Sequence, residues 1–174
     1  MSPIALSSHQ AAVLYGPKDL RVDDRTLWPP LHGQAQVAIV ATGLCGSDCK
    51  SSPLLLPILP SPPPLLHLFS HPPFHAVHYY LHGRNGDFAL QAPLVLGHEA
   101  AGIVTAVGPG VKNLVPGQRV AIEAGVMCNN CDYCSKGRYN LCKSLRFASS
   151  AKTFPHLDGT LQERMNHPAH VLHP

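Results

Sequence analysis

The chain has 174 residues, a length typical of one domain, and carries 13 lysines and arginines against 10 aspartates and glutamates. The resulting net charge of +3 is small and scattered, which argues against a nucleic-acid-binding protein. No apolar run approaches the roughly 20 residues of a membrane span, and residues 1–10 do not resemble a signal peptide. We therefore expect a cytoplasmic protein without nucleic-acid or membrane partners, in which clustered cysteines bind metal rather than form disulfides.

Short apolar stretches with glycine- and proline-rich turns dominate the sequence. Strands are predicted at residues 9–15, 18–22, 34–42, 102–108 and 117–123, with one or two more in 160–172. In the third stretch, Val37, Ile39 and Ala41 fall on one face at period two. Many short strands and few helix-period segments predict a mainly β fold, either a small barrel or a distorted sandwich.

Residues 49–77 differ in character from the rest of the chain. They contain 8 of the 18 prolines, and no charged side chain occurs from Ser51 to Gly83. Because proline interrupts helices and central strands, we predict an irregular insert here, with the composition of translated non-coding sequence. Five histidines recur at spacings of three or four, but the prolines interrupt them and we interpret the pattern as coincidence; they are His67, His71, His75, His78 and His82.

Four cysteines within 15 residues form the strongest motif. They follow the pattern C-x2-C-x2-C-x7-C and are Cys128, Cys131, Cys134 and Cys142. Four thiolates fill the tetrahedral coordination sphere of zinc, so this spacing predicts a closed, structural zinc site. Buried or disulfide-bonded cysteines are the alternative interpretation.

A second candidate metal site combines Cys45, in GLCGSD, with His98 and Glu99, in PLVLGHEAAG. Three such ligands suit zinc and leave a fourth position open, where an alcohol oxygen could bind and have its pKa lowered. Ser47 is then a candidate proton relay, two residues beyond the cysteine. Taken alone, a single cysteine is more often a small buried side chain, so the ordinary structural interpretation stays open.

Several unlinked motifs resemble one known family. Residues 97–111, GHEAAGIVTAVGPGV, are similar to the signature of the zinc-dependent medium-chain alcohol dehydrogenases, and GLCGSD, the cysteine cluster and GRYNLC resemble the same family's catalytic domain. HYYLHGRNGDF and DGTLQERMNHPAHVLH are most similar to the polyol branch, which includes sorbitol, xylitol and L-arabinitol dehydrogenases. The resemblance covers residues 9–48 and 78–174.

The resemblance implies a GroES-like distorted β-barrel with short helices and a zinc-binding loop, spanning residues 1–174 and interrupted by the insert 49–77. It implies a catalytic zinc on Cys45, His98 and Glu99, a structural zinc on the four clustered cysteines, Ser47 as proton relay and Tyr79 in the substrate pocket. In some relatives the glutamate is a ligand and in others it lies behind the metal, so both roles stay open for Glu99.

The implied reaction is NAD(P)-dependent oxidation of a secondary hydroxyl of a sugar alcohol to a ketone. The sequence contains no dinucleotide fingerprint such as G-x-G-x-x-G, and the C-terminal Rossmann domain of the family is expected to be absent from these 174 residues. We therefore expect the chain alone to be inactive. An exposed apolar face would favour a homo-oligomer or aggregation. The sequence leaves open the polyol and the choice between NAD and NADP.

Two other classes of function stay open at this point. One is a zinc-stabilised interaction module, or an inactive relative, that keeps only the four-cysteine site. The other is a nucleic-acid-binding domain built on the same zinc, which the sequence disfavours because it lacks a basic face with interleaved aromatic residues. Metal content discriminates, since two zinc ions per chain favour a dehydrogenase domain and one favours the interaction module.

Overall fold

A long hairpin begins the fold. The computed structural model describes residues 7–43 and 76–174, and its first two strands are β1 (Ser7–Gly16) and β2 (Asp19–Leu27), paired antiparallel. Alternate β1 side chains, Ala11 and Val13 among them, are buried, whereas β2 is mostly exposed. This period-two pattern is typical of a strand with one face on the core. On its other edge, β1 pairs with β6 (Leu94–Val95).

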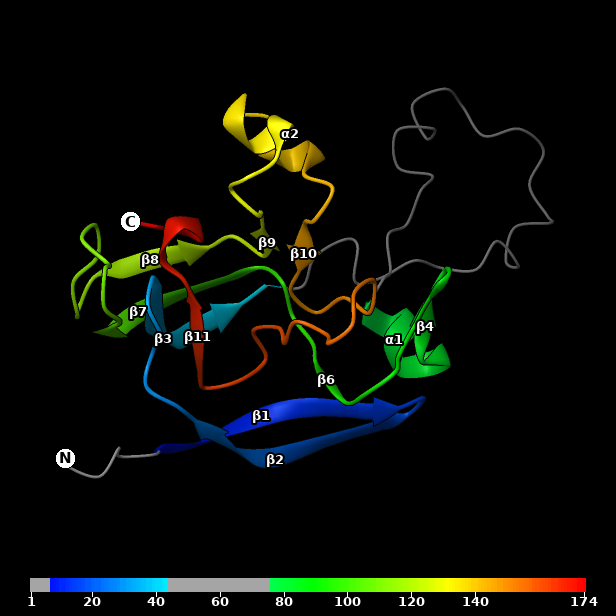
Figure 1. Cartoon of the computed structure of the whole chain (residues 1–174). Coiled ribbons are helices and arrows are strands. Elements are labelled where there is room, and N and C mark those ends of the chain that lie inside the picture. Colours follow the sequence, from blue (N-terminus) through cyan, green and yellow to red (C-terminus); the bar gives the residue numbers. More distant parts are fainter. Residues whose placement is uncertain (1–6, 44–75) are drawn as a thin grey trace, which may run out of the picture.

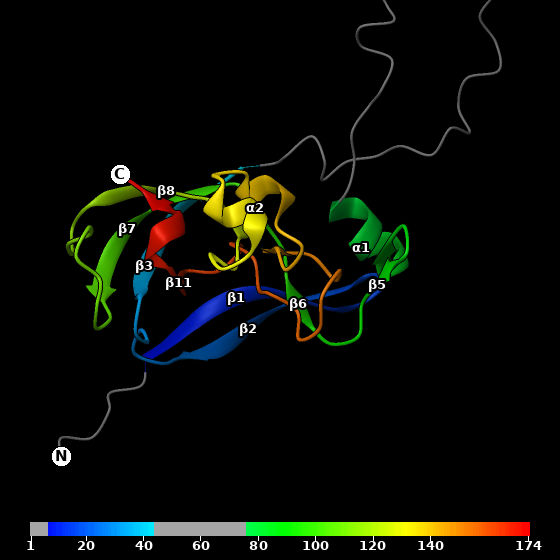
Figure 2. The same cartoon turned by 45° about the horizontal axis from the view of Figure 1, so that its top comes forward.

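The principal sheet has five antiparallel strands in the order β11-β3-β7-β8-β12. Their bounds are Arg164–Pro168 for β11, Gln34–Thr42 for β3, Ala100–Val107 for β7, Arg119–Ile122 for β8 and Leu172–His173 for β12. Figure 1 shows this sheet curling over the β1–β2 hairpin, with α2 projecting on the side away from the hairpin. The turned view of Figure 2 shows the same two layers.

The larger core cluster is built on the five-stranded sheet. All five strands of this sheet contribute, and the buried members include Val37, Val104, Val120, Met165 and Leu172. A second cluster joins β1 and β6 to α1 through Leu14, Leu94, Leu96 and Tyr79. The apolar periodicity of the predicted strands therefore supplies most of the buried surface, which is the dominant stabilising term.

The period-two prediction for the third strand holds only in part. Val37 is fully buried and Ile39 is half-buried, but Ala41 is exposed. The register of β3 against β7 shifts between Ile39 and Ala41, because Ile39 lies opposite Gly102 and Ala41 lies opposite Ala101. This β-bulge inserts one extra residue and turns the end of the strand, so Ala41 leaves the core face.

The remaining elements are short. They are α1 (Ala76–His82), β4 (Arg84–Asn85), β5 (Phe88–Ala89), β9 (Gly125–Val126), α2 (Asp132–Ser135), η3 (Tyr139–Leu141), β10 (Arg146–Phe147) and η4 (Ala169–Val171). The helix α1 includes residues 76 and 77, which the sequence interpretation placed in the insert; the rest of the insert lies outside the described residues. No helix in the described ranges is long and apolar enough to cross a membrane. The predicted mainly β, barrel-like fold with short helices is confirmed.

Candidate metal sites

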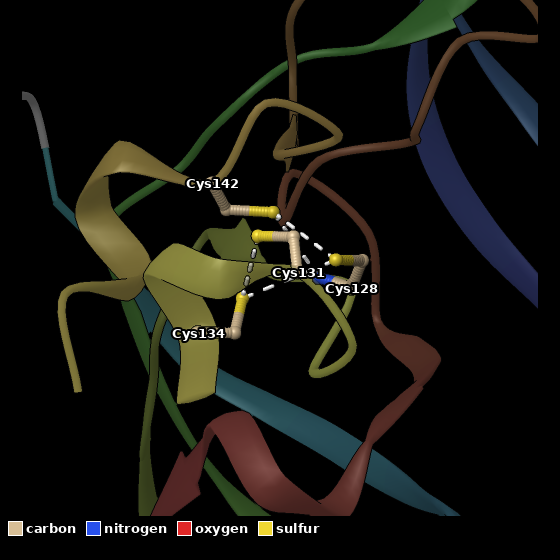
Figure 3. A group of neighbouring side chains, drawn as sticks. All are labelled: Cys128, Cys131, Cys134 and Cys142. Atoms are coloured by element: carbon tan, nitrogen blue, oxygen red, sulfur yellow. Dashed lines mark hydrogen bonds between the residues drawn. The ribbon is translucent and has the colours of Figure 1, made fainter. Parts of the chain in front are cut away.

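The four clustered cysteines converge on one point. Figure 3 shows the four side chains turned toward one another. Their sulfur atoms all lie within 4.8 Å of one another, and the sulfur of Cys128 lies 3.5 Å from that of Cys142 and 3.9 Å from that of Cys134. A tetrahedral ion with Zn–S bonds of about 2.3 Å requires sulfur atoms about 3.8 Å apart. The cluster therefore has the size and the donor set for a zinc ion with no open position.

The thiols of this cluster differ in acidity because their surroundings differ. Hydrogen bonding from the backbone N–H of Cys134 lowers the pKa of Cys131 to about 6, and a backbone hydrogen bond from Cys128 lowers the pKa of Cys142. Burial raises the pKa of Cys134 to about 11. Four adjacent thiolates repel one another, so a dication is what allows all four to be charged at once.

The loop that carries these cysteines is anchored at both of its ends. The strand β9 precedes it and β10 follows it, and the two pair through Val126 with Arg146 and Gly125 with Phe147. Within the loop, neither α2 nor η3 contains a buried residue. The apolar packing here comes from a small cluster of Met127, Cys142 and Val171, with Leu145 packed against it. The cations near the cluster, Lys136, Arg138 and Lys143, are exposed.

His98 and Glu99 lie in the tight connection between β6 and β7. Gly97, just before them, has φ +92°, a conformation that favours glycine. A β-carbon on Gly97 would lie 2.8 Å from the hydroxyl oxygen of Thr160 and 3.0 Å from the Thr42 methyl carbon. The glycine of the GHE motif therefore lets two other segments pack directly behind His98.

The side chains of His98 and Glu99 face a cleft of about 450 Å³. The His98 ring packs against Phe147 with ring centroids 5.6 Å apart and planes tilted by 55°. The cleft is formed where the β6–β7 connection meets the strands and the loop around the cysteine cluster. Its lining residues are His98, Glu99, Glu123, Ala124, Gly125, Tyr139, Asn140, Leu145 and Phe147.

Two histidines hold Glu123 at the wall of this cleft. The imidazole Nε2 of His173 lies 2.9 Å from the Glu123 carboxylate, and Nε2 of the fully buried His167 lies 2.9 Å from the Glu123 carbonyl oxygen. A carbonyl only accepts, so Nε2 of His167 carries the proton, and Nδ1 of this ring is buried without a partner in the described structure. Burial lowers the pKa of His167, which keeps the ring neutral.

The predicted ligand Cys45 and the predicted relay Ser47 lie outside the described residues. The chain leading to them leaves β3 next to the other two predicted ligands, since the Gly43 N–H donates to the Glu99 carbonyl oxygen at 2.6 Å. A β-carbon on Gly43 would also lie 3.1 Å from the Glu99 carboxylate. The meeting of Cys45 with His98 therefore stays a prediction.

Tyr79, predicted to contact substrate, is a largely buried side chain of α1. It is 4% exposed and packs among Leu14, Leu94 and Leu96, and its hydroxyl oxygen accepts a 2.9 Å hydrogen bond from the Ala151 N–H. Tyr79 is not among the residues that line the described cleft. Its role toward substrate also stays a prediction.

Sequence reasoning did not single out several cleft residues. Phe147 reaches His98 from 49 positions away, and Glu123 and Asn140 come from two further segments. None of them shares a spacing pattern with His98. Asn140 and Tyr139 lie inside the quoted GRYNLC stretch, which was the one signal that could have pointed to them.

A curled β domain with a four-thiolate loop beside a histidine-lined cleft defines the class of GroES-like barrels with a metal-binding loop. The family model for the alcohol dehydrogenase GroES-like domain matches residues 74–174, more than half of the chain. The chain therefore belongs to the alcohol dehydrogenase GroES-like domain family, which confirms the resemblance seen in its motifs.

Similar proteins carry related names. The chain is 36% identical over 169 residues to sorbitol dehydrogenase of Rattus norvegicus, covering 97% of this chain and 38% of that one. Among solved structures, L-idonate 5-dehydrogenase of Escherichia coli is similar at a TM-score of 0.74 and 30% identity, over 99% of this chain and 41% of that one. An Escherichia coli alcohol dehydrogenase solved with NADH is similar at a TM-score of 0.67 and 26% identity, over 95% of this chain and 38% of that one. The chain spans little more than a third of the length of these relatives.

Proposed function

We propose that this chain is the zinc-binding catalytic domain of an NAD(P)-dependent polyol dehydrogenase, which oxidises a secondary alcohol to a ketone. Support comes from the family, from relatives named for sorbitol and L-idonate, and from a similar structure solved with NADH. The nicotinamide would be bound outside the described residues, since the sequence given contains no dinucleotide fingerprint.

One observation carries the proposal. His98 and Glu99, from the GHE motif, face a cleft of about 450 Å³, within the range of small-molecule sites. The strand β3, which precedes Cys45 in the sequence, ends beside them, because the N–H of Gly43 donates to the Glu99 carbonyl oxygen. A cysteine, a histidine and a carboxylate form a donor set that fits zinc with an open position.

In this proposal Cys45, His98 and Glu99 hold the catalytic zinc. When bound, zinc polarises the alcohol oxygen and lowers its pKa. The Ser47 hydroxyl accepts the proton that the alcohol loses and passes it outward, and Tyr79 contacts the substrate. Phe147 packs on His98 and limits the orientations of the imidazole, while its exposed edge gives the cleft an apolar wall.

The four-cysteine site has a different proposed role. Its four sulfur atoms leave no room for water or substrate on the ion, so we assign it to a structural zinc that folds the loop between β9 and β10. The loop contributes Tyr139 and Asn140 to the cleft, so its folding also completes the cleft wall.

Elemental analysis of the purified 174-residue chain tests the proposal. We expect two zinc ions per chain, one zinc after Cys45→Ala and one after Cys134→Ala. Ser135→Ala is the matched control. The Ser135 hydroxyl donates to the Asp132 carbonyl oxygen, so this variant should keep both ions. One zinc in the native chain, unchanged by Cys45→Ala, would favour the zinc-stabilised interaction module instead.

We propose a cytoplasmic enzyme that associates as a homo-oligomer, with residues 49–77 as an insert in the barrel. These 174 residues alone should give no rise in nicotinamide absorbance when NAD and a polyol are added.

A further inference from the structure

The segment that follows Gly159 passes directly behind the connection that carries His98. The N–H of Thr160 donates to the carbonyl oxygen of Gly97 at 2.9 Å, and the N–H of Leu161 donates to that of Leu96 at 2.8 Å. Thr160 itself is 1% exposed. The backbone immediately before His98 is therefore held by a buried residue more than sixty positions further along the chain.

The same threonine is bonded to the end of β3. The hydroxyl of Thr42 donates to the Thr160 carbonyl oxygen at 3.0 Å, and the two hydroxyl oxygens lie 3.3 Å apart. Thr42 is the last residue of β3, and Cys45 follows it by three positions in the sequence. A tether of three residues spans at most about 11 Å.

Close packing fixes this arrangement as well as hydrogen bonding. At Gly97 an added β-carbon would meet the Thr160 hydroxyl at 2.8 Å and the Thr42 methyl at 3.0 Å, so both side chains occupy the space that a larger residue would fill. Three segments from distant parts of the sequence thus meet at Gly97, the residue before His98.

We infer that Thr42 and Thr160 form a positioning pair, which holds the Gly97–Glu99 connection against the end of β3 and so fixes how the candidate ligands His98 and Glu99 face the cleft. This inference rests on the proposed function, because it assumes an open metal site on those segments. Neither threonine is a ligand in the inference. The pair acts through the backbone of Gly97, which accepts from Thr160, and through Gly43, which follows Thr42 and donates to the Glu99 carbonyl oxygen.

Substitutions can separate positioning from bulk stability. Thr42→Val keeps the shape of the side chain but removes both hydrogen bonds, Thr160→Val removes only the contact between the hydroxyls, and Thr42→Ser retains the hydroxyl. Thr105→Val is the matched control. Its hydroxyl also makes two contacts, to the backbone and side-chain oxygens of Gln36, on the same sheet but away from the cleft.

The readout is metal affinity at each site. The full chain is loaded with one equivalent of zinc and titrated with cobalt(II), whose visible absorption reports thiolate and imidazole coordination; the Cys45→Ala variant identifies the signal of the open site. Because partners that orient metal ligands typically contribute 10- to 100-fold in affinity, we expect Thr42→Val to weaken cobalt binding at the open site about tenfold or more. Thr160→Val should weaken it less, Thr42→Ser should restore it to within about threefold, and Thr105→Val should leave it unchanged.

Three results would overturn the inference. If Thr42→Val or Thr160→Val lowers the unfolding temperature but leaves open-site affinity and the cobalt spectrum native, the pair is merely structural. If both sites lose affinity equally, the effect is general instability. If the native chain shows no open-site signal and Cys45→Ala changes nothing, the proposed function itself fails and the inference fails with it. Should Thr42→Val not fold, the Thr160→Val titration decides between the first two outcomes.

Discussion

Gly159 packs so tightly against the backbone of Gly97 that a β-carbon on Gly159 would lie 2.3 Å from the Gly97 carbonyl oxygen. The obstructing atoms belong to the backbone, so they cannot rotate away. We expect Gly159→Ala to lower the free energy of unfolding by about 3 kcal/mol, measured by urea titration. Gly16→Ala is the control, since nothing lies within 4 Å of its added carbon, and its effect should stay within about 0.5 kcal/mol. Equal stability of the two variants would contradict the close packing.

Removing the hydroxyl of Tyr79 should destabilise the fold. That oxygen accepts from the Ala151 N–H at a buried position, so Tyr79→Phe leaves a buried donor without a partner. An unsatisfied buried group costs about 1–3 kcal/mol, whereas Tyr80→Phe, at a side chain 38% exposed, should cost nothing measurable. Chemical unfolding of the two variants measures the difference. A native-like stability for Tyr79→Phe would argue against the buried hydrogen bond and in favour of a purely substrate-directed role.

Phe147→Ala should change the surroundings of His98 while leaving the fold largely intact. The two rings lie 5.6 Å apart, so the aromatic ring current acts on the imidazole protons. We expect the His98 Cε1–H resonance, measured by NMR on the zinc-loaded chain, to shift in Phe147→Ala. Phe88→Ala is the matched control, because Phe88 is 41% exposed and Phe147 is 40% exposed. It should leave that resonance in place. An unshifted His98 signal in both variants would mean that the rings do not pack in solution.

Stability should fall below neutral pH partly because of His167. Burial lowers the pKa of this ring in the folded chain, so the unfolded chain binds the proton more readily. The contribution of His167 to the free energy of unfolding is therefore fully present above the unfolded pKa of about 6.5. It decreases as the pH falls below that value, by at most about 1.4 kcal/mol per pH unit for one proton. His170, whose pKa burial also lowers, contributes in the same direction.

Urea titrations at pH 7.5 and 5.5 measure this effect. His167→Gln retains a donor toward the Glu123 carbonyl oxygen but cannot titrate, so its stability should change less between the two pH values than that of the native chain. His32→Gln, at an exposed position, should show the native pH dependence. An identical slope in all three proteins would exclude His167 as the titrating group.

Local patterns predicted the features that depend on neighbours in sequence. The strand at 34–42 was placed at its observed bounds, and the C-x2-C spacing placed sulfur atoms that do converge. The strand predicted at 18–22 extends to Leu27 in the structure, because pairing with β1 as far as Ser7 outweighs the polar composition of residues 23–26. The β-bulge that exposes Ala41 follows from pairing with β7, which no periodicity within β3 reveals.

The surroundings of the candidate site depended on contacts that no motif encodes. The ring of Phe147 on His98 and the hydroxyl pair of Thr42 and Thr160 join residues 49 and 118 positions apart. Phenylalanine and threonine are common residue types at strand ends and in loops, so only the folded chain shows which of them lie beside the candidate site. The sequence proposed candidate ligand types, and tertiary packing places the residues around His98 and Glu99.

The pairing of β3 with β11 has a consequence for biosynthesis. Residues opposite each other in this ladder, such as Ala38 and Arg164, are separated by more than a hundred positions. One edge of β3 must therefore wait, unpaired, until the ribosome has produced the partner strand. Until residues 164–168 are made, this edge of β3 presents unpaired backbone N–H and C=O groups, which are a template for pairing with another chain.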